Sequence, residues 1–243
     1  MKKSFVLLST FIALCMNMQI SLANIETIKN MAKSFPREMK PEFIDKTPID
    51  GVYVLSNPRL AFMMDSSGQY LIKGDIFDLK TQENITDIIF QNHYSINPKQ
   101  LPLAQAFKEV KGNGKRILYI FADPDCPACQ ALQAGLEEMD DVTIYTFPIA
   151  LIRLHPTALE TNKKIWCSKE PLKVWKNYLV DAVKPHNQST SCNNPIDQNM
   201  ELAKKHNVDL TPTIFNALGQ RMVGIPDEEE FEEFINAKKV RLN

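Results

Sequence analysis

The fold of this chain is decided by the stretch Ile117-Leu118-Tyr119-Ile120-Phe121-Ala122-Asp123-Pro124-Asp125-Cys126-Pro127-Ala128-Cys129. It opens with an apolar run of strand length, rich in isoleucine and aromatic residues. The chain then turns through Asp-Pro-Asp and starts a helix that carries two cysteines in a C-x-x-C spacing. This spacing places Cys129 about one helical turn beyond Cys126, so the two sulfur atoms can form a bond with little backbone movement.

The start of a helix favours a thiolate at Cys126, because free N–H groups and the positive end of the helix dipole stabilise negative charge. The neighbouring carboxylates of Asp123 and Asp125 are expected to oppose it. Apolar residues follow at helical spacing and predict one buried helix face: Cys129, Leu132, Leu136 and Met139. We therefore expect Cys126 to face solvent as a nucleophile, with Cys129 sheltered behind it as the resolving thiol.

Two nearby cysteines can also form half of a metal site. Here the C-x-x-C follows a predicted strand and opens a predicted helix, which is the context typical of redox motifs. The later cysteines, Cys167 and Cys192, do not form a second C-x-x-C, which weakens the case for zinc. The pattern favours redox chemistry over metal binding, with no metal and no other cofactor.

Residues 1–23 have the pattern of a secretory signal peptide. Lys2 and Lys3 form the positive start, residues 5–16 the apolar centre, and Ser21-Leu22-Ala23 a small-x-small cleavage site. A transmembrane anchor is the rival interpretation, but the apolar run is short and polar residues interrupt its end. We expect export.

Cleavage after residue 23 removes two lysines and no acidic residue, so the formal net charge changes from −1 to −3. No basic stripe remains, and no nucleic-acid partner is expected. Four cysteines remain, and an even number in an oxidising compartment predicts one reactive and one structural disulfide. A bond between Cys167 and Cys192 would close a loop of about 25 residues and stabilise the fold by about 3–4 kcal/mol. A free pair is the alternative.

The N-terminal part is predicted to be a small domain, residues 24–86, followed by a linker at 87–113 with a short helix over Leu103–Val110. An amphipathic helix, broken by prolines, is expected from residue 24 to about 46. Strands are then expected at Gly51–Leu55, Leu60–Met64 and Tyr70–Leu79. So small a segment cannot bury a large core, and its strand edges favour pairing with a second copy of the chain. Packing on its own C-terminal part is the alternative.

The C-terminal domain is predicted at 114–243, with a helical insertion at about 150–206. The sequence predicts a strand and helices in this order: Val142–Phe147, His155–Val183, Ile196–His206 and a last helix from about Asp227. Pro212 must lie at the start of a strand, because it cannot donate to the ladder. The Thr211–Pro212 bond is a candidate for the cis form. A cis turn would leave the flanking backbone groups unpaired and facing a substrate strand.

This order of elements resembles a thioredoxin fold, and nearly the whole chain after residue 23 resembles the DsbC/DsbG family of periplasmic disulfide isomerases. The resemblance rests on these segments: Phe121–Cys129, Ile165-Trp166-Cys167 with the later Cys192, Thr211-Pro212-Thr213, and Tyr70–Leu79. It implies a mixed α+β and α/β protein with a small cystatin-like N-terminal dimerisation domain, a linker, and a C-terminal thioredoxin fold with a helical insertion. It also implies a periplasmic homodimer and a DsbD-type membrane reductase that keeps the C-x-x-C pair reduced.

Two departures from known patterns bear on activity. Ile120 stands where thioredoxins carry a buried aspartate, and Pro127-Ala128 replaces the Gly-Tyr of the best-known isomerase and the Pro-His usual in oxidases. Thr211 favours an isomerase, since oxidases usually place valine there. We therefore predict an isomerase whose Cys126 attacks wrong disulfides in unfolded or misoxidised exported proteins, with Thr211 and Pro212 holding the substrate backbone. A dimeric oxidase and a chaperone-like binding module with secondary thiols are the alternatives.

Overall fold

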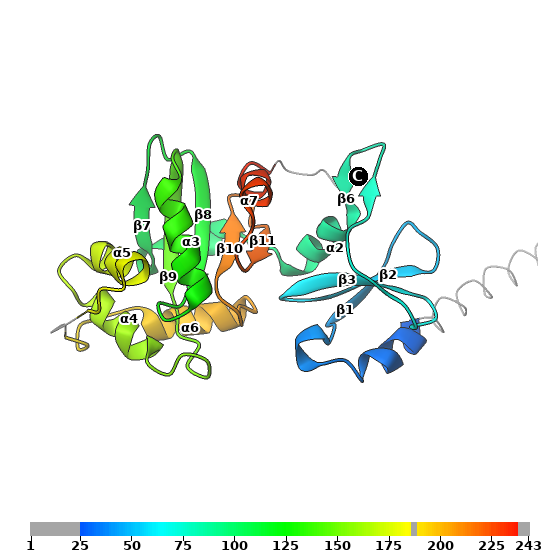
Figure 1. The fold of residues 1–243 in the computed structure, drawn as a ribbon, viewed down its shortest axis with the longest axis horizontal. Helices are drawn as coiled ribbons and strands as arrows, with labels where there is room; N and C mark the ends of the chain where they lie inside the picture. Colours follow the sequence, from blue (N-terminus) through cyan, green and yellow to red (C-terminus); the bar gives the residue numbers. More distant parts are fainter. Residues whose placement is uncertain (1–24, 186–188, 238–243) are drawn as a thin grey trace, which may run out of the picture. The chain divides into compact units, whose positions relative to one another are not determined.

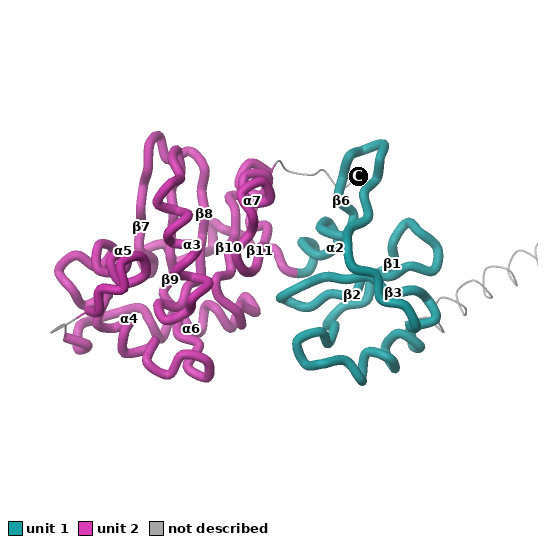
Figure 2. The backbone as a smooth tube through the Cα atoms, in the orientation of Figure 1, with its two compact units in different colours: residues 1–93 teal, residues 94–243 magenta. Residues whose placement is uncertain are grey.

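The structure is a computed structural model that describes residues 25–185 and 189–237 of the 243-residue chain. The predicted signal peptide, residues 1–23, lies outside the described residues. The chain divides into two compact units, one ending at His93 and the other beginning at Tyr94 (Figure 2). Each is described by itself. Within the described ranges, every helix is too short or too polar to cross a membrane.

The first unit contains a four-stranded antiparallel sheet with the order β1-β2-β3-β4 (Figure 1). A helix at residues 25–32 precedes the sheet, and its buried Ile28 joins Tyr53, Leu55, Phe62 and Met64 in one core cluster. The remaining elements follow in chain order: η1 (Arg37–Met39), β1 (Phe43–Lys46), β2 (Val52–Asn57), β3 (Leu60–Asp65), β4 (Leu71–Ile72), β5 (Phe77–Asp78), β6 (Glu83–Asn84) and α2 (Ile85–Tyr94). Alternate residues of β2 and β3 thus build the small core.

Two predictions for this unit are wrong in detail. The first helix ends before Pro36, in agreement with the predicted break there, but the chain beyond it is not helical up to residue 46: after η1, strand β1 forms and pairs with β2. The strand predicted at Tyr70–Leu79 is instead two short strands, β4 and β5. Between them Gly74 adopts a positive φ of 138°, a conformation that glycine tolerates because it has no Cβ.

The second unit is built on a five-stranded sheet with the order β11-β10-β8-β9-β7. Strands β8 and β9 are parallel and α3 joins them, as predicted, whereas the other pairs are antiparallel. The elements are η2 (Pro98–Gln100), η3 (Leu103–Gln105), β7 (Phe107–Val110), β8 (Arg116–Ala122), α3 (Pro127–Glu138), β9 (Val142–Pro148), α4 (Ala158–Trp166), α5 (Pro171–Asp181), α6 (Ile196–Lys205), β10 (Thr213–Asn216), β11 (Arg221–Val223) and α7 (Glu228–Ile235).

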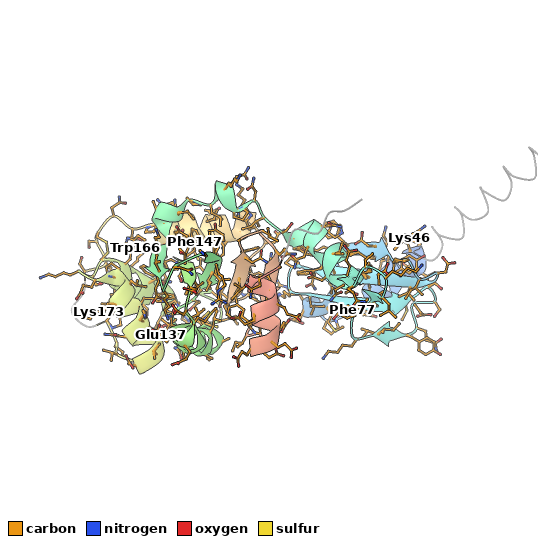
Figure 3. The ribbon with its side chains drawn as sticks, turned by 90° about the horizontal axis from the view of Figure 1, so that it is seen from above. Lys46, Phe77, Glu137, Phe147, Trp166 and Lys173 are labelled. Atoms are coloured by element: carbon orange, nitrogen blue, oxygen red, sulfur yellow. A yellow bond between two sulfur atoms is a disulfide. The ribbon has the colours of Figure 1, made fainter. Side chains whose placement is uncertain are left out.

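Strand β8 supplies side chains to both faces of this sheet. Leu118 and Ile120 belong to the cluster that includes residues of α3, α5 and α7, whereas Tyr119 and Phe121 belong to the cluster that includes α6. Trp166 and Phe147, labelled in Figure 3, are members of the first and the second cluster respectively. This arrangement explains why the strand is apolar at nearly every position: it is covered on both sides.

The helix predicted at Leu103–Val110 is wrong. Only η3 is helical there, and Phe107–Val110 is strand β7, which pairs with the edge of β9. Phe107 is buried against the rings of Trp166 and Trp175, while its neighbour Lys108 is exposed. This alternation has the period of a strand. The predicted linker, 87–113, thus contains most of α2 and a strand of the second sheet.

The helical insertion contains two helices where one was predicted over His155–Val183. Helix α4 ends at Trp166, and Pro171 occupies the first position of α5, where its missing N–H is tolerated. Trp175 is fully buried, whereas Ala182 is exposed and ends α5 with a positive φ of 55°. A disulfide joins Cys167, at the end of α4, to Cys192, with a Cα–Cα distance of 5.6 Å.

Candidate active site

Cys126 immediately precedes α3, and Cys129 lies in the first turn of that helix, as the sequence predicts. Strand β8 ends at Ala122, and a tight turn follows, in which the N–H of Cys126 donates to the carbonyl oxygen of Asp123 at 3.2 Å. Pro127 takes the first helical position. Both cysteines are free thiols in this structure.

The prediction that Cys126 faces solvent is wrong. Cys126 is 7% exposed and Cys129 is 2% exposed. The loop before β10 is responsible: pairing of Thr213 with Phe121 brings that loop beside the turn, and the Cys126 thiol donates to the carbonyl oxygen of Thr211 at 3.3 Å. Only a small part of the Cys126 side chain is therefore accessible.

The two thiols differ in acidity. A hydrogen bond from the Cys129 thiol lowers the pKa of Cys126 most strongly; burial opposes it, and donation by Thr211 and the N–H groups of Cys129 and Ala128 adds to it. The pKa of Cys126 is thereby lowered from 9.0 to about 5. Burial, together with the bond to Cys126 and its charge, raises the pKa of Cys129. At neutral pH one sulfur is a thiolate and the other a thiol.

The structure places Thr211 and Pro212 directly beside Cys126, joined by a cis peptide bond as predicted. The expectation of unpaired backbone groups at this turn agrees with the Thr211 N–H, for which the described residues provide no acceptor, but not with the carbonyls. The carbonyl of Pro212 accepts from the N–H of Gly224 at 2.9 Å, and that of Thr211 accepts from the Cys126 thiol. Among the described residues, the buried Thr211 hydroxyl makes no hydrogen bond in this geometry. It is therefore available to donate once Cys126 is a thiolate, and this contact adds to that of Cys129 in lowering the pKa of Cys126.

Asp123 is fully buried and fastens the active-site turn to the following loop. Its carboxylate accepts from the N–H of Leu151 at 2.7 Å and of Asp125 at 2.9 Å, and its own N–H donates to the sulfur of Cys129 at 3.4 Å. The Nδ1 atom of His155 lies 3.1 Å from the carboxylate. Burial raises the pKa of Asp123, and these contacts oppose that rise. Asp123 thus has a structural role that the sequence did not indicate.

Asp125, the residue before the first cysteine, is held by two hydroxyl groups of the helical insertion. Its Oδ1 accepts from the hydroxyl of Tyr178 at 2.8 Å, and its Oδ2 accepts from that of Thr157 at 2.5 Å. Burial and then this bond raise the pKa of Tyr178 to about 12. The sequence indicates neither contact, because no local pattern signals a contact across 32 or 53 positions.

No group of three or more histidine, cysteine, aspartate or glutamate side chains suited to a metal ion occurs in residues 25–185 and 189–237. Cys126 and Cys129 lie on the same turn of the chain, where the N–H of Asp123 contacts the Cys129 sulfur and the Cys126 thiol contacts the carbonyl oxygen of Thr211.

The chain matches two family models, the disulfide bond isomerase protein N-terminal domain over residues 20–87 and the thioredoxin-like domain over residues 103–239. The probable thiol:disulfide interchange protein DsbC of Bordetella pertussis is 34% identical over 69% of this chain and 59% of its own length. DsbG of Escherichia coli is 27% identical over 67% of this chain and 71% of its own.

Among solved structures, a disulfide interchange protein from Neisseria gonorrhoeae is 34% identical, with a TM-score of 0.53 over 56% of this chain and 96% of that one. The order of the two matched domains confirms the fold class inferred from the sequence: a DsbC-type N-terminal domain, then a thioredoxin fold that carries the helical insertion. The alignment with the Bordetella pertussis relative spans about 59% of that protein. The chain belongs to the thioredoxin-like family and, within it, to the DsbC/DsbG group of thiol:disulfide interchange proteins.

Proposed function

We propose that this protein reduces and isomerises wrong disulfides in exported proteins through Cys126 and Cys129. The observation that carries the proposal is the difference between the two thiols. The pKa of Cys126 is about 5, whereas that of Cys129 is raised. Because the thiolate is the attacking species, Cys126 is ready to react at neutral pH, whereas Cys129 stays protonated until the second step.

In the first step the Cys126 thiolate attacks one sulfur of a substrate disulfide. A mixed disulfide forms, and the other substrate sulfur leaves as a thiolate. If a second substrate thiolate then attacks the mixed disulfide, a new substrate pairing forms and Cys126 is released unchanged. No electrons are gained or lost in this isomerisation.

The alternative second step is reduction. Cys129 loses its proton and attacks the sulfur of Cys126, so the substrate leaves with both sulfurs reduced and the protein carries the disulfide. The two electrons come from the Cys126–Cys129 pair, and an outside reductant must return them. A DsbD-type membrane reductase is our proposal for that partner.

Thr211 and Pro212 are proposed to align the substrate. Thr211 lies against Cys126 through its carbonyl oxygen, and its N–H has no acceptor among the described residues. An extended substrate segment that contains a disulfide can pair with that N–H and bring its sulfur to Cys126. The Thr211 hydroxyl would then stabilise the thiolate of Cys126 when that sulfur leaves the mixed disulfide.

We further propose a periplasmic homodimer, exported by cleavage after residue 23. In the first unit, large apolar side chains of the β4 and β5 region are exposed: Tyr70, Leu71, Ile72, Phe77 and Leu79. Exposed apolar side chains on short edge strands favour pairing with a second copy. In this proposal residues 24–86 form the dimerisation domain, 87–113 the connection and 114–243 the redox-active domain.

The test is refolding of a scrambled multi-disulfide substrate by wild type, Cys126→Ala and Cys129→Ala in one redox buffer. Wild type should restore native pairing and Cys126→Ala should not. Cys129→Ala should isomerise but accumulate mixed disulfides, which gel analysis after alkylation reveals. Refolding by Cys126→Ala at the wild-type rate would refute the proposal. Suppression of aggregation, measured alongside, separates simple holding of unfolded chains from exchange.

A further inference from the structure

A carboxylate stands next to the nucleophile in this chain, because Asp125 directly precedes Cys126. A like charge close to a thiolate opposes its formation. The Cys126 thiol is nevertheless strongly acidic, and the groups that set its pKa are Cys129, Thr211 and backbone N–H groups. The direction in which the Asp125 carboxylate is held therefore matters for its neighbour.

The side chains of these two adjacent residues bind different parts of the domain. Asp125 binds Tyr178 on α5 and Thr157 at the start of α4, whereas Cys126 binds Thr211 in the loop before β10. Helix α5 packs on α3 and β7, and β7 lies at the opposite edge of the sheet order from β10 and β11. The backbone of Cys126 is extended, so consecutive side chains diverge.

Both oxygen atoms of the Asp125 carboxylate have a hydroxyl donor. Hydrogen bonds to an ionised acceptor are the strong ones, and they fix its orientation and spread its charge. The other titratable groups at this turn are Asp123 with its neighbour His155, Cys129 on α3, and Tyr178 itself. The carboxylate of Asp123 accepts from the N–H groups of Leu151 and Asp125, so its acceptor atoms bind backbone donors and not the hydroxyl groups that bind Asp125.

We propose that Tyr178 and Thr157 are positioning residues that hold the Asp125 carboxylate toward the helical insertion and so preserve the thiolate of Cys126. The inference deepens the proposed function, and its biological meaning rests on that function. Its effect is on the thiol itself, which can be measured without any substrate. In this arrangement the insertion controls the reactivity of a cysteine that belongs to the thioredoxin core.

The test is the pH dependence of Cys126 alkylation in the reduced full-length protein, with the modified residue identified by peptide mapping. Tyr178→Phe removes one donor and keeps the ring. The freed carboxylate should then raise the pKa of Cys126 by about half a unit, roughly a threefold change in the ionisation constant. Thr157→Val should act in the same direction. Tyr145→Phe, a tyrosine of the cluster on the other sheet face, is the matched control and should leave the pKa unchanged.

The decisive comparison is made in an Asp125→Asn background. Without the carboxylate there is no charge to restrain, so Tyr178→Phe should no longer shift the pKa of Cys126. Two results would overturn the inference. If Tyr178→Phe leaves the pKa of Cys126 unchanged while Asp125 is present, the tyrosine has no effect on the thiol. If Tyr178→Phe shifts the pKa equally in the Asp125→Asn background, the shift comes from altered packing and not from the carboxylate.

The outcome is separable from that of the proposed function. If the pKa responds as expected but the wild type fails to refold scrambled substrate, the positioning role stands and the function falls. If refolding succeeds while Tyr178→Phe leaves the pKa unchanged, the function stands and the positioning role falls. Unfolding by urea, measured on each variant, verifies that all of them are folded during the titration.

Discussion

The sulfur of Cys126 lies 3.3 Å from the carbonyl oxygen of Thr211, a residue 85 positions later in the chain. This contact closes the active-site turn against the loop before β10 and leaves the nucleophile only 7% exposed. Ionisation of Cys126 removes the proton that this contact uses, so in the thiolate form the Thr211 carbonyl no longer accepts from the sulfur. The reactivity of Cys126 follows from its hydrogen bonds rather than from its exposure.

Alkylation of the reduced protein should modify Cys126 alone at neutral pH. The rate should be half-maximal near pH 5, because the pKa of Cys126 is about 5 and only the thiolate reacts. Cys129 should remain unmodified, since it is buried and its pKa is raised. Stopped-flow alkylation with mass mapping measures both. A rate that keeps rising through about pH 8.5, as in an ordinary thiol, would contradict this prediction.

Thr211→Val should raise the pKa of Cys126 by about one to two units. The hydroxyl of Thr211 donates to the thiolate, and a hydrogen bond to a charged group contributes roughly 1.5–3 kcal/mol. The same titration measures the shift. Thr143→Val is the control: its hydroxyl donates to the carbonyl of Gly114 at 2.8 Å, in the β8–β9 pair away from the cysteines. An unshifted profile in Thr211→Val would exclude the donor role.

The stability of the reduced protein should depend on pH through Cys126. Its pKa is about 5 when folded and 9.0 ordinarily, so between these values the folded state has released a proton that the unfolded state keeps. Stability from this group is therefore complete above about pH 9 and is lost as pH falls through 5, a change on the order of a few kcal/mol.

Urea unfolding at several pH values checks this linkage, and the Cys126–Cys129 disulfide form is the matched control. It has no thiol to ionise at these positions, so the contributions of all other groups are common to both forms. The difference in unfolding free energy between the reduced and oxidised forms should grow as pH rises from 5 to 9. A constant difference would contradict the low pKa.

Asp123→Asn should destabilise the second unit by about 1–3 kcal/mol. The buried carboxylate accepts from two N–H groups, those of Leu151 and Asp125, and an asparagine oxygen can replace only one acceptor atom. Urea unfolding measures the loss. Asp181→Asn, at the exposed end of α5, should change stability little and serves as the control. Equal stability of the two variants would count against the proposed fastening role.

Joint replacement of Cys167 and Cys192 by alanine should destabilise the protein, with Cys126 and Cys129 kept as free thiols, by about 3 kcal/mol. The reason is that the lost disulfide closes a loop with a sequence separation of 25. The pKa of Cys126 should be unchanged if Tyr178 and Thr157 keep their places. Thermal unfolding and the alkylation profile report these two effects. An unchanged melting temperature would show that the bond contributes nothing to stability.

The sequence was sufficient for the parts of the fold that local patterns determine. The strand before Cys126, the helix after it and the strand at Val142–Pro148 were predicted because strand and helix periods, prolines and apolar runs are local signals. Asp227 caps α7 as expected, its side chain accepting from the N–H of Glu230 at 2.9 Å. The cis bond at Thr211–Pro212 also followed from local chemistry.

The errors arise where contacts with residues distant in sequence determine the local structure. Strand β7 was predicted as a helix, and only its pairing with β9 shows that Phe107–Val110 is extended. The burial of Cys126 depends on Thr211, and the restraint on Asp125 depends on Tyr178. Each of these contacts joins two segments that are too far apart in the sequence for a local pattern to reveal. The sequence pointed to Cys126, Cys129, Thr211 and Pro212 as candidate site residues, but not to the side chains that contact Asp125.

The disulfide between Cys167 and Cys192 makes the maturation of this chain depend on an oxidant in the compartment where it folds. Forming that bond removes two electrons, and the reduced Cys126–Cys129 pair cannot accept them. A separate electron acceptor must therefore take them before the helical insertion is cross-linked. If the protein acts as proposed, it can mature only in a compartment where another oxidant already forms disulfides.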